Sequence, residues 1–411
     1  MFCKRHVISL FLAIVVLLFP LVIEAMGQGY FPPKNVWRSN EPAAAGFDKA
    51  KLEAAVSFAV ANESKAPRDQ QLGQAQTFGR EPFGESIGPY KTRGEMTGLI
   101  IRRGLLVKSW GEPDRIDMTH SVTKSFLTAT VGLAYDKGII KNLKSPVYKE
   151  MAPVLKYEPD RRFGSTDEFG RTGFLELFNT SHNKKIDWDS LLRQTSDWEG
   201  VLWGKPDWAD RPAKDRKTWL TRKRNAPGTV FEYNDVRVNL LALAALNVIR
   251  EPLPSYLKKH LMDEIGASDT WRWHGYENSF IVLDGKIVQS VSGGGHWGGG
   301  MFINAFDMAR LGVLIENEGV WDGKRLLSRE FLNLAETPTA ARPTYGFMNF
   351  FLNTEKGLYP KAPEGTVAFL GNGTNLVYID KENDLVIVAR WINGQKIDEF
   401  LSLVYGALKD E

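Results

Sequence analysis

The chain has 411 residues, of which 43% are hydrophobic and 25% are charged, a balance typical of a globular protein with enough apolar material for a large core. Its 52 Lys and Arg residues nearly balance its 49 Asp and Glu residues, which leaves a formal net charge of +3. Because the sequence contains no dense basic stripe interleaved with aromatic residues, we expect no nucleic-acid partner.

The N-terminal residues have the pattern of an export signal. Lys4 and Arg5 precede an apolar run from Val7 to Ile23, and Ala25 is a small residue suited to cleavage. We therefore predict a signal peptide over residues 1–25 and a periplasmic or secreted protein. The alternative is an uncleaved membrane anchor, because the apolar run reaches the short end of the length that spans a bilayer. A membrane contact is expected only in that case.

The cysteine and histidine content excludes several kinds of site. Cys3 is the only cysteine and lies before the apolar run, so the predicted mature chain has none. This excludes a disulfide framework and thiolate catalysis. His296 stands alone in a glycine-rich run, and no H-x-x-H or H-E-x-x-H pair exists, so we expect His296 to be a loop or cleft residue rather than a metal ligand. We expect neither a metal nor a cofactor.

The first elements after the predicted signal are a helix, a loop and a hairpin. The stretch from Phe47 to Glu63 spaces its apolar residues three and four apart, which predicts an amphipathic helix. The polar, Gly- and Pro-rich segment 64–95 has no clear period and predicts a long surface loop. Two β-rich runs separated by Arg103 and Gly104 then predict a hairpin.

The remaining pattern predicts an α+β protein in which both chain ends build one sheet domain. Residues 112–299 are helical and loop-rich, and their clearest helix starts at Asp235. Four later runs rich in β-branched and aromatic residues predict antiparallel strands: YGFMNFFLN, TVAFLGNG, NLVYIDKE and DLVIVARWI. Residues 396–408 predict a final helix. We therefore expect a sheet domain from residues 26–111 and 300–411, with a helical domain, residues 112–299, inserted.

The stretch MTHSVTKSFLTATVG contains a candidate nucleophile. If a helix begins there, Ser121 and Lys124 lie side by side, because positions three apart share a helix face. The backbone N–H groups at the helix N-terminus favour an oxyanion nearby. An amine accepts a serine proton only when it is uncharged, and burial favours the uncharged form. The same pattern also fits a capping serine with a lysine that reaches solvent.

Two further stretches hold candidate site residues. Tyr233 precedes the long helix and would move a proton between Ser121 and a leaving group. The alternative makes Tyr233 a boundary residue, and in either case we expect Asp235 to cap the helix. The turn from Gly371 to Asn375 joins two predicted strands and is also compatible with a simple hairpin.

In chain order, SVTK, YND and NGT resemble the S-x-x-K, Y-x-N and K-T-G or H-x-G motifs of the serine β-lactamase and penicillin-binding-protein superfamily. The similarity is to the class C β-lactamase-like branch, which includes esterases and 6-aminohexanoate-dimer hydrolases. It covers nearly all of the predicted mature chain. The resemblance implies a five-stranded antiparallel sheet flanked by terminal helices, packed on an all-α domain with the site between them.

The resemblance also implies roles for individual residues. Ser121 would be the acylated nucleophile, Lys124 its base and Tyr233 the proton relay, while the backbone N–H groups of Ser121 and Asn375 would form the oxyanion hole. A cluster of tryptophans between the first two motifs predicts either an aromatic wall over the cleft or core packing. The further pocket candidates are Asp235, Asn372, Gly373, Thr374, Trp198 and Trp203.

Two departures from the family pattern bear on the substrate. Asp235 stands where the family usually has Asn, and Asn372 stands where β-lactamases carry a cationic lysine. A neutral amide binds a carboxylate more weakly than a cation does. We therefore expect an exported serine hydrolase that cleaves a small-molecule ester or amide. The alternatives are a β-lactamase or D,D-peptidase proper, and a catalytically silent binding protein on the same scaffold.

Overall fold

The structure, a computed structural model, describes residues 29–159 and 173–409, so the predicted signal peptide lies outside the described residues. Its largest sheet has six antiparallel strands in the order β12-β13-β14-β15-β1-β2. No helix in the described ranges is both long and apolar enough to cross a membrane. The six strands are β1 (Thr97–Arg102), β2 (Leu105–Trp110), β12 (Phe351–Leu352), β13 (Val367–Gly371), β14 (Asn375–Asp380) and β15 (Leu385–Arg390).

Both ends of the chain build this sheet, as the sequence predicts. Strand β1 pairs with β15 in a register that places Thr97 opposite Arg390. The hairpin from β1 to β2 turns at Arg103 and Gly104. The α+β class with an antiparallel sheet is confirmed. The sheet has six strands where five were expected, because the two-residue strand β12 joins the edge beside β13.

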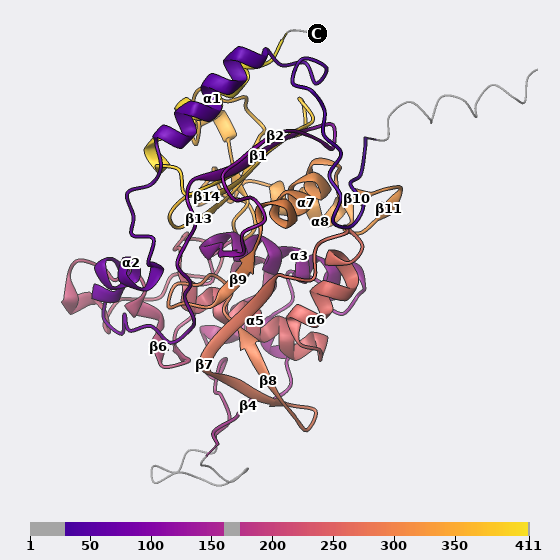
Figure 1. Cartoon of the computed structure of the whole chain (residues 1–411). Coiled ribbons are helices and arrows are strands. Elements are labelled where there is room, and N and C mark those ends of the chain that lie inside the picture. Colours follow the sequence, from indigo (N-terminus) through magenta and orange to yellow (C-terminus); the bar gives the residue numbers. More distant parts are fainter. Residues whose placement is uncertain (1–28, 160–172, 410–411) are drawn as a thin grey trace, which may run out of the picture.

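The sheet separates two apolar cores, because successive side chains of a strand point to opposite faces. On one face, Ile100 and Ile387 pack in a core with α1 (Lys49–Ala61) and α9 (Ile397–Ala407). On the other face, Leu99 and Val388 join the larger core, which includes α7 (Ala305–Glu316). Figure 1 shows α1 above the sheet and α7 between the sheet and the rest of the molecule.

The helices that carry the site pack in the larger core. Helix α3 (Thr123–Asp136) contacts α5 (Asp235–Ile249), and α5 also contacts α4 (Trp188–Leu192) and α6 (Leu253–Leu257). Side chains from Asp235 to Asn247 are all buried, so α5 is surrounded by protein along most of its length. Another helix, α8 (Arg329–Glu336), packs on α3. The N-termini of α3 and α5 are therefore held in fixed positions.

The expectation of an all-helical middle segment does not hold. A second antiparallel sheet has the order β3-β9-β7-β4, and β8 pairs with β7. Strands β7 and β8 form a long hairpin that turns at Asp284 and Gly285. The φ angles of these two residues, 50° and 77°, lie in the left-handed region that tight hairpin turns require. Its strands are β3 (Asp117–Met118), β4 (Leu155–Lys156), β7 (Arg272–Leu283), β8 (Lys286–Val291) and β9 (Gly300–Ile303).

The segment 64–95, expected to be a surface loop, contains a short helix and packs on the protein. Helix α2 (Gln70–Gln76) is followed by a 3₁₀ turn, Phe78–Arg80. The buried Lys205 Nζ lies 2.8 Å from Glu85 Oε1, and the N–H of Gly88 donates to the Trp297 carbonyl at 3.0 Å. These contacts fix the segment beside the glycine-rich run that includes His296.

Candidate active site

Ser121 and Lys124 lie together at the start of α3. Ser121 belongs to the 3₁₀ turn His120–Val122, and Lys124 lies in the first turn of the helix that follows. Lys124 Nζ is 2.8 Å from Ser121 Oγ. Lys124 is fully buried, whereas Ser121 is partly exposed. The arrangement therefore places an amine against a serine hydroxyl that a ligand can reach.

Asp235 holds Lys124 from the other side. Lys124 Nζ lies 2.8 Å from Asp235 Oδ1, and Arg211 Nη1 lies 3.1 Å from Asp235 Oδ2. Burial acts to raise the pKa of Asp235, but the cations Lys124 and Arg211 outweigh it and hold that pKa below its ordinary range. Asp235 is therefore an anion shared by two cations. The expected capping role belongs to Asn234, whose side chain accepts from the Arg237 N–H at 3.1 Å.

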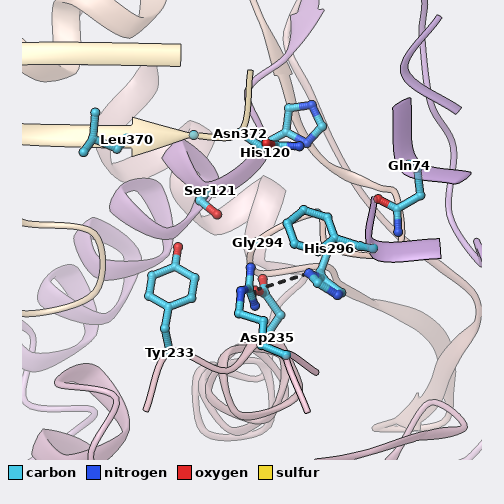
Figure 2. A pocket seen from close by; sticks show the side chains of 13 residues that line it. Gln74, His120, Ser121, Tyr233, Asp235, Gly294, His296, Leu370 and Asn372 are labelled. Atoms are coloured by element: carbon cyan, nitrogen blue, oxygen red, sulfur yellow. Dashed lines mark hydrogen bonds and ion pairs between the residues drawn. The ribbon is translucent and has the colours of Figure 1, made fainter. Parts of the chain in front are cut away.

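Tyr233 completes the group of three predicted catalytic residues. Figure 2 shows its hydroxyl directed toward Ser121. Lys124 Nζ lies 4.7 Å from the centroid of the Tyr233 ring. Burial, reinforced by the Asp235 charge, raises the pKa of Tyr233, so its phenol carries a proton at neutral pH.

Two glycines allow the backbone to approach this group. A Cβ atom on Gly294 would lie 2.0 Å from Asp235 Oδ1 and 2.2 Å from Lys124 Nζ. A Cβ atom on Gly371 would lie 2.1 Å from the Thr119 carbonyl oxygen and 3.3 Å from the Ser121 nitrogen. The contacts of 2.0 to 2.2 Å are far shorter than a Cβ atom makes with its neighbours, so any larger residue at either position would displace the site. The glycine-rich run around His296 is thus part of the site.

A pocket of about 210 Å³ opens onto Ser121. It is formed by the 3₁₀ turn before α3, the segment before α5, the glycine-rich run, the end of β13 and the segment 64–95. Residues from this last segment were missed by sequence reasoning, since a polar stretch without a period gives no sign of burial. The lining residues are Gln74, Phe78, His120, Ser121, Arg211, Tyr233, Asp235, Gly294, Gly295, His296, Leu370, Gly371 and Asn372.

The third motif is divided between the pocket and the protein interior. Asn372 lines the pocket, but Gly373 and Thr374 do not. Asn375 is fully buried at the start of β14, where its side chain accepts from Arg390 Nε at 2.8 Å and donates to the Asn372 carbonyl at 3.1 Å. The structure thus brings Asn372 to Ser121 and places Asn375, the expected second oxyanion donor, outside the pocket lining.

The two candidate tryptophans lie in the core. Trp198 and Trp203 are 1% and 3% exposed, and neither lines the pocket. Trp198 Nε1 donates to the Leu177 carbonyl at 2.6 Å. This placement fits the core-packing alternative. The aromatic side chains of the pocket are instead Phe78, Tyr233 and the imidazoles His120 and His296.

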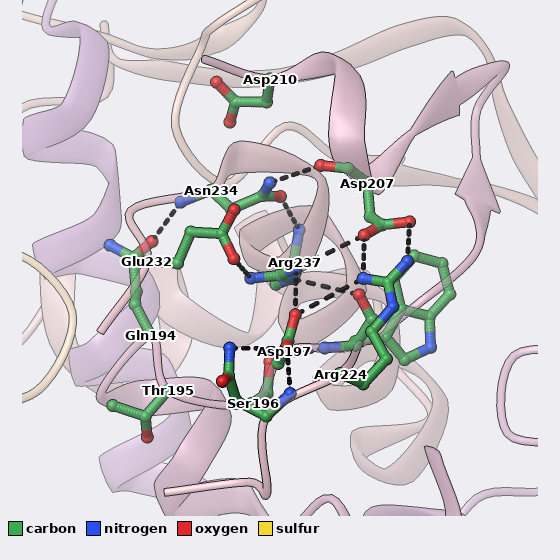
Figure 3. A network of polar contacts seen from close by, with 12 residues as sticks. Gln194, Thr195, Ser196, Asp197, Asp207, Asp210, Arg224, Glu232, Asn234 and Arg237 are labelled. Atoms are coloured by element: carbon green, nitrogen blue, oxygen red, sulfur yellow. Dashed lines mark hydrogen bonds and ion pairs between the residues drawn. The ribbon is translucent and has the colours of Figure 1, made fainter. Parts of the chain in front are cut away.

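A buried polar network fixes the segments on which Tyr233 and Arg211 stand (Figure 3). Arg237 Nη2 lies 2.8 Å from Asp197 Oδ1, and its Nη1 lies 2.7 Å from Glu232 Oε2. The Asn234 side chain donates to the Asp207 carbonyl at 2.6 Å. The network therefore joins residues 232–237 to the segment that leads into Arg211.

One group of side chains has the composition of a cation site. Ligand atoms of Glu81, Asp210 and His296 lie within 4.8 Å of one another. His296 Nε2 is 2.9 Å from Glu81 Oε2 and 3.6 Å from Asp210 Oδ1. The Arg211 guanidinium already pairs with Asp210 Oδ1, which sets a positive charge beside any incoming cation. Ion pairing and hydrogen bonding therefore account for this group.

His120, directly before the nucleophile, has a structural position. Its Nε2 lies 2.8 Å from Gln70 Oε1, and its φ of 49° is in the left-handed region. Burial, reinforced by the nearby cations Arg390 and Lys124, lowers the pKa of His120 to about 3, so the imidazole is neutral.

Known proteins share this architecture. A solved protein provisionally described as a 6-aminohexanoate-dimer hydrolase from Bacillus anthracis matches with a TM-score of 0.53 and 15% identity, over 92% of this chain and 88% of that one. EstCE1, a hydrolase with promiscuous acyltransferase activity, matches with a TM-score of 0.52 and 16% identity, over 87% and 99%. A family VIII carboxylesterase matches with a TM-score of 0.50 and 14% identity, over 84% and 98%.

At these identities the structural matches establish the fold. No match was found among curated proteins. The family model described as Beta-lactamase matches residues 107–400, which is more than half of the chain and includes all three motifs. The chain therefore belongs to the beta-lactamase family and is a serine hydrolase.

Proposed function

We propose that this protein is an exported hydrolase that cleaves a small ester or amide through an acyl-enzyme on Ser121. The observation that carries the proposal is the 2.8 Å separation of Lys124 Nζ and Ser121 Oγ, together with the pocket that Ser121 and Tyr233 line. An unactivated serine is a weak nucleophile, and an adjacent base makes attack on a carbonyl carbon feasible.

Acylation follows from this geometry. Lys124, as the free amine, takes the Ser121 proton while Oγ attacks the carbonyl carbon. The resulting ammonium is stabilised by Asp235, 2.8 Å away. The negative oxygen of the tetrahedral intermediate accepts hydrogen bonds from the backbone N–H groups of Ser121 and of Asn372, the third-motif residue that lines the pocket. The proton then passes through Tyr233 to the leaving oxygen or nitrogen, and the carbonyl re-forms as the acyl-enzyme.

Deacylation uses the same groups in reverse. Water adds to the acyl carbonyl carbon, and its one released proton passes through Tyr233 to Lys124. Collapse of the second tetrahedral intermediate returns a proton to Ser121 Oγ and releases the carboxylic acid. The neutral, buried phenol of Tyr233 suits this exchange, because it donates a proton at one step and recovers one at the next.

The size and polarity of the pocket favour small esters or linear amides over β-lactams. Its volume of about 210 Å³ is below the range typical of drug-sized ligand sites. Asn372 provides no charge where the third motif of β-lactamases carries a cation. A β-lactamase or D,D-peptidase activity is the alternative. A silent binding protein is disfavoured by the close contact between Ser121 and Lys124, which ligand binding alone does not require.

Ester turnover by matched serine variants tests the proposal. Hydrolysis of p-nitrophenyl acetate and butyrate by the purified mature protein should vanish in Ser121→Ala and persist in Ser255→Ala, which removes an exposed hydroxyl on α6. Turnover that survives in Ser121→Ala would refute the assignment. Export is tested separately, by the N-terminal sequence of the protein recovered from the periplasm or medium, which should begin near residue 26.

A further inference from the structure

Arg211 is a partly exposed cation in the pocket of the nucleophile. Its side chain is 34% exposed, whereas those of its two acidic partners, Asp210 and Asp235, are 0% and 1% exposed. Arg211 and Ser121 line the same pocket of about 210 Å³. A group bound at Ser121 is therefore within a few atoms of the guanidinium.

Only one edge of the Arg211 guanidinium is used by the protein. Both acidic partners bind Nη1, with Asp235 Oδ2 at 3.1 Å. A guanidinium has five N–H donors, and among the described residues Nε and Nη2 of Arg211 have no hydrogen-bond partner. The N–H groups on Nε and Nη2 point in parallel, and this is the edge that binds both oxygens of a carboxylate.

The free edge is held in a defined orientation. Arg211 Cζ lies 5.1 Å from the centroid of the Phe78 ring and 4.9 Å from that of Tyr233, so two aromatic rings confine the guanidinium. The backbone of Arg211 has a φ of 50°, which an arginine adopts only when surrounding contacts impose it. A preorganised arginine loses little conformational freedom when it binds a planar anion.

The charges around Arg211 permit an anionic ligand. The Lys124 ammonium and Arg211 match the formal charge of Asp210 and Asp235. When Lys124 is the free amine, burial, which raises the pKa of Asp210, reduces the negative charge that an incoming carboxylate meets. Asp210 and Asp235 both lie behind the used edge, at Nη1. The unused N–H groups are therefore available to a ligand, and the third motif, with neutral Asn372, contributes no competing cation.

We propose that Arg211 binds a carboxylate of the substrate, so that the substrate class is a small ester or amide that carries a free carboxylate. The proposal rests on the proposed hydrolase function and specifies its substrate. The cation that β-lactamases place on the third motif is thus replaced by one from the segment before α5.

Two matched substrate pairs test this subsite. In the first, the carboxylate is on the leaving group: 4-acetoxybenzoate against 4-acetoxybenzamide. In the second it is on the acyl chain: mono(4-nitrophenyl) adipate against 4-nitrophenyl hexanoate. For at least one pair, kcat/KM of the wild-type protein should favour the carboxylate by about tenfold to a hundredfold, the usual effect of a charge-assisted hydrogen bond.

Variants at Arg211 should change this ratio and not only the rate. Arg211→Gln should bring the ratio close to one, and Arg211→Lys should retain part of the preference because it keeps the charge. Within each variant, the ratio of kcat/KM for the carboxylate substrate to that for its neutral partner cancels any general loss of activity that follows from the disturbed Asp235. Lys214→Gln, which removes an exposed cation nearby that does not line the pocket, should leave the ratio unchanged. A ratio near one in the wild type, or one that Arg211→Gln leaves intact, overturns the proposal.

A binding measurement separates this proposal from the hydrolase function. Binding of two ligand pairs to Ser121→Ala protein can be measured by ligand-observed NMR titration. In at least one pair the carboxylate should bind at least tenfold tighter than the amide: benzoate compared with benzamide, or adipamate compared with hexanamide. The difference should disappear when Arg211→Gln is added. If the protein hydrolyses no ester but shows this difference, the catalytic proposal fails and the subsite stands. Equal binding within both pairs, together with turnover that ignores the carboxylate, refutes the subsite alone.

Discussion

Lys124 and Asp235 form a fully buried ion pair, with 2.8 Å between Nζ and Oδ1. The same lysine contacts the Ser121 hydroxyl, so the carboxylate at the N-terminus of α5 holds the base against the nucleophile on α3. An asparagine, which the family usually has here, would also hydrogen-bond but would bring no charge. Asp235 thus binds both Lys124, the base beside Ser121, and Arg211, and its ion pair with Lys124 also joins α5 to α3.

Removal of the Asp235 carboxylate should destabilise the fold. Asp235→Ala leaves Lys124 buried without its anion, and the loss of one partner of a buried pair typically costs about 3–5 kcal/mol of unfolding free energy. Asp235→Asn should cost less, because the amide still accepts one hydrogen bond. Urea unfolding followed by tryptophan fluorescence measures both. A cost below about 1 kcal/mol for Asp235→Ala would contradict the buried pair.

Removal of the Tyr233 hydroxyl should reduce turnover while the fold is kept. Tyr233→Phe retains the ring that packs on Lys124 and Arg211 and deletes only the group that exchanges the proton. We expect kcat for p-nitrophenyl butyrate to fall by about 10²–10⁴-fold, the usual contribution of general acid–base catalysis. Circular dichroism and the urea midpoint serve as controls for folding. Near wild-type kcat would show that the proton takes another route.

Acid should destabilise the protein in part through His120. The folded pKa of about 3 lies below the unfolded value of about 6.5, so between these pH values the unfolded chain binds a proton that the folded protein excludes. Stability therefore falls as the pH drops through this window. His120→Asn, whose side chain tolerates a positive φ and does not titrate, removes this contribution.

The comparison requires unfolding free energies at two pH values. Between pH 7 and pH 5, the wild-type protein should lose up to about 2 kcal/mol more than His120→Asn, because one proton corresponds to about 1.36 kcal/mol per pH unit. His260→Asn, at a more exposed position with a smaller shift, is the control and should behave more like the wild type. Parallel losses in the wild-type protein and His120→Asn would mean that His120 titrates normally when folded.

Small esters should be better substrates than β-lactams. The pocket of about 210 Å³ accommodates a short acyl group, and Asn372 offers no cation where β-lactamases bind the β-lactam carboxylate. We expect kcat/KM for p-nitrophenyl acetate or butyrate to exceed that for a chromogenic cephalosporin. The opposite order, measured on the same preparation, would favour the β-lactamase alternative.

Sequence reasoning succeeded where a local pattern determines the local structure. The spacing of Ser121 and Lys124 fixes their proximity on a helix, and the β-rich runs around Arg103 and Gly104 form the predicted hairpin. The second long hairpin was missed although Asp284 and Gly285 are favourable turn residues, because the flanking strand residues 272–283 are mixed in polarity. A sheet was therefore not expected in the middle of the chain.

Other parts of the site depend on contacts between distant segments. Gln74 and Phe78 reach the pocket because the segment 64–95 is anchored through Glu85 and Gly88, which no local period reveals. Arg211 sits in a stretch rich in basic residues and is distinguished only by its position beside Asp235. The family resemblance predicts Asn375 as the second oxyanion donor, and the turn places Asn372 rather than Asn375 in the pocket lining.

Acylation of Ser121 is tested by the mass of the protein after exposure to a fluorophosphonate probe, because the probe forms a stable adduct only with an activated serine. We expect one adduct per chain, located by peptide mapping on Ser121 and absent from Ser121→Ala. An adduct on another serine, or no adduct on the folded wild-type protein, would contradict this expectation.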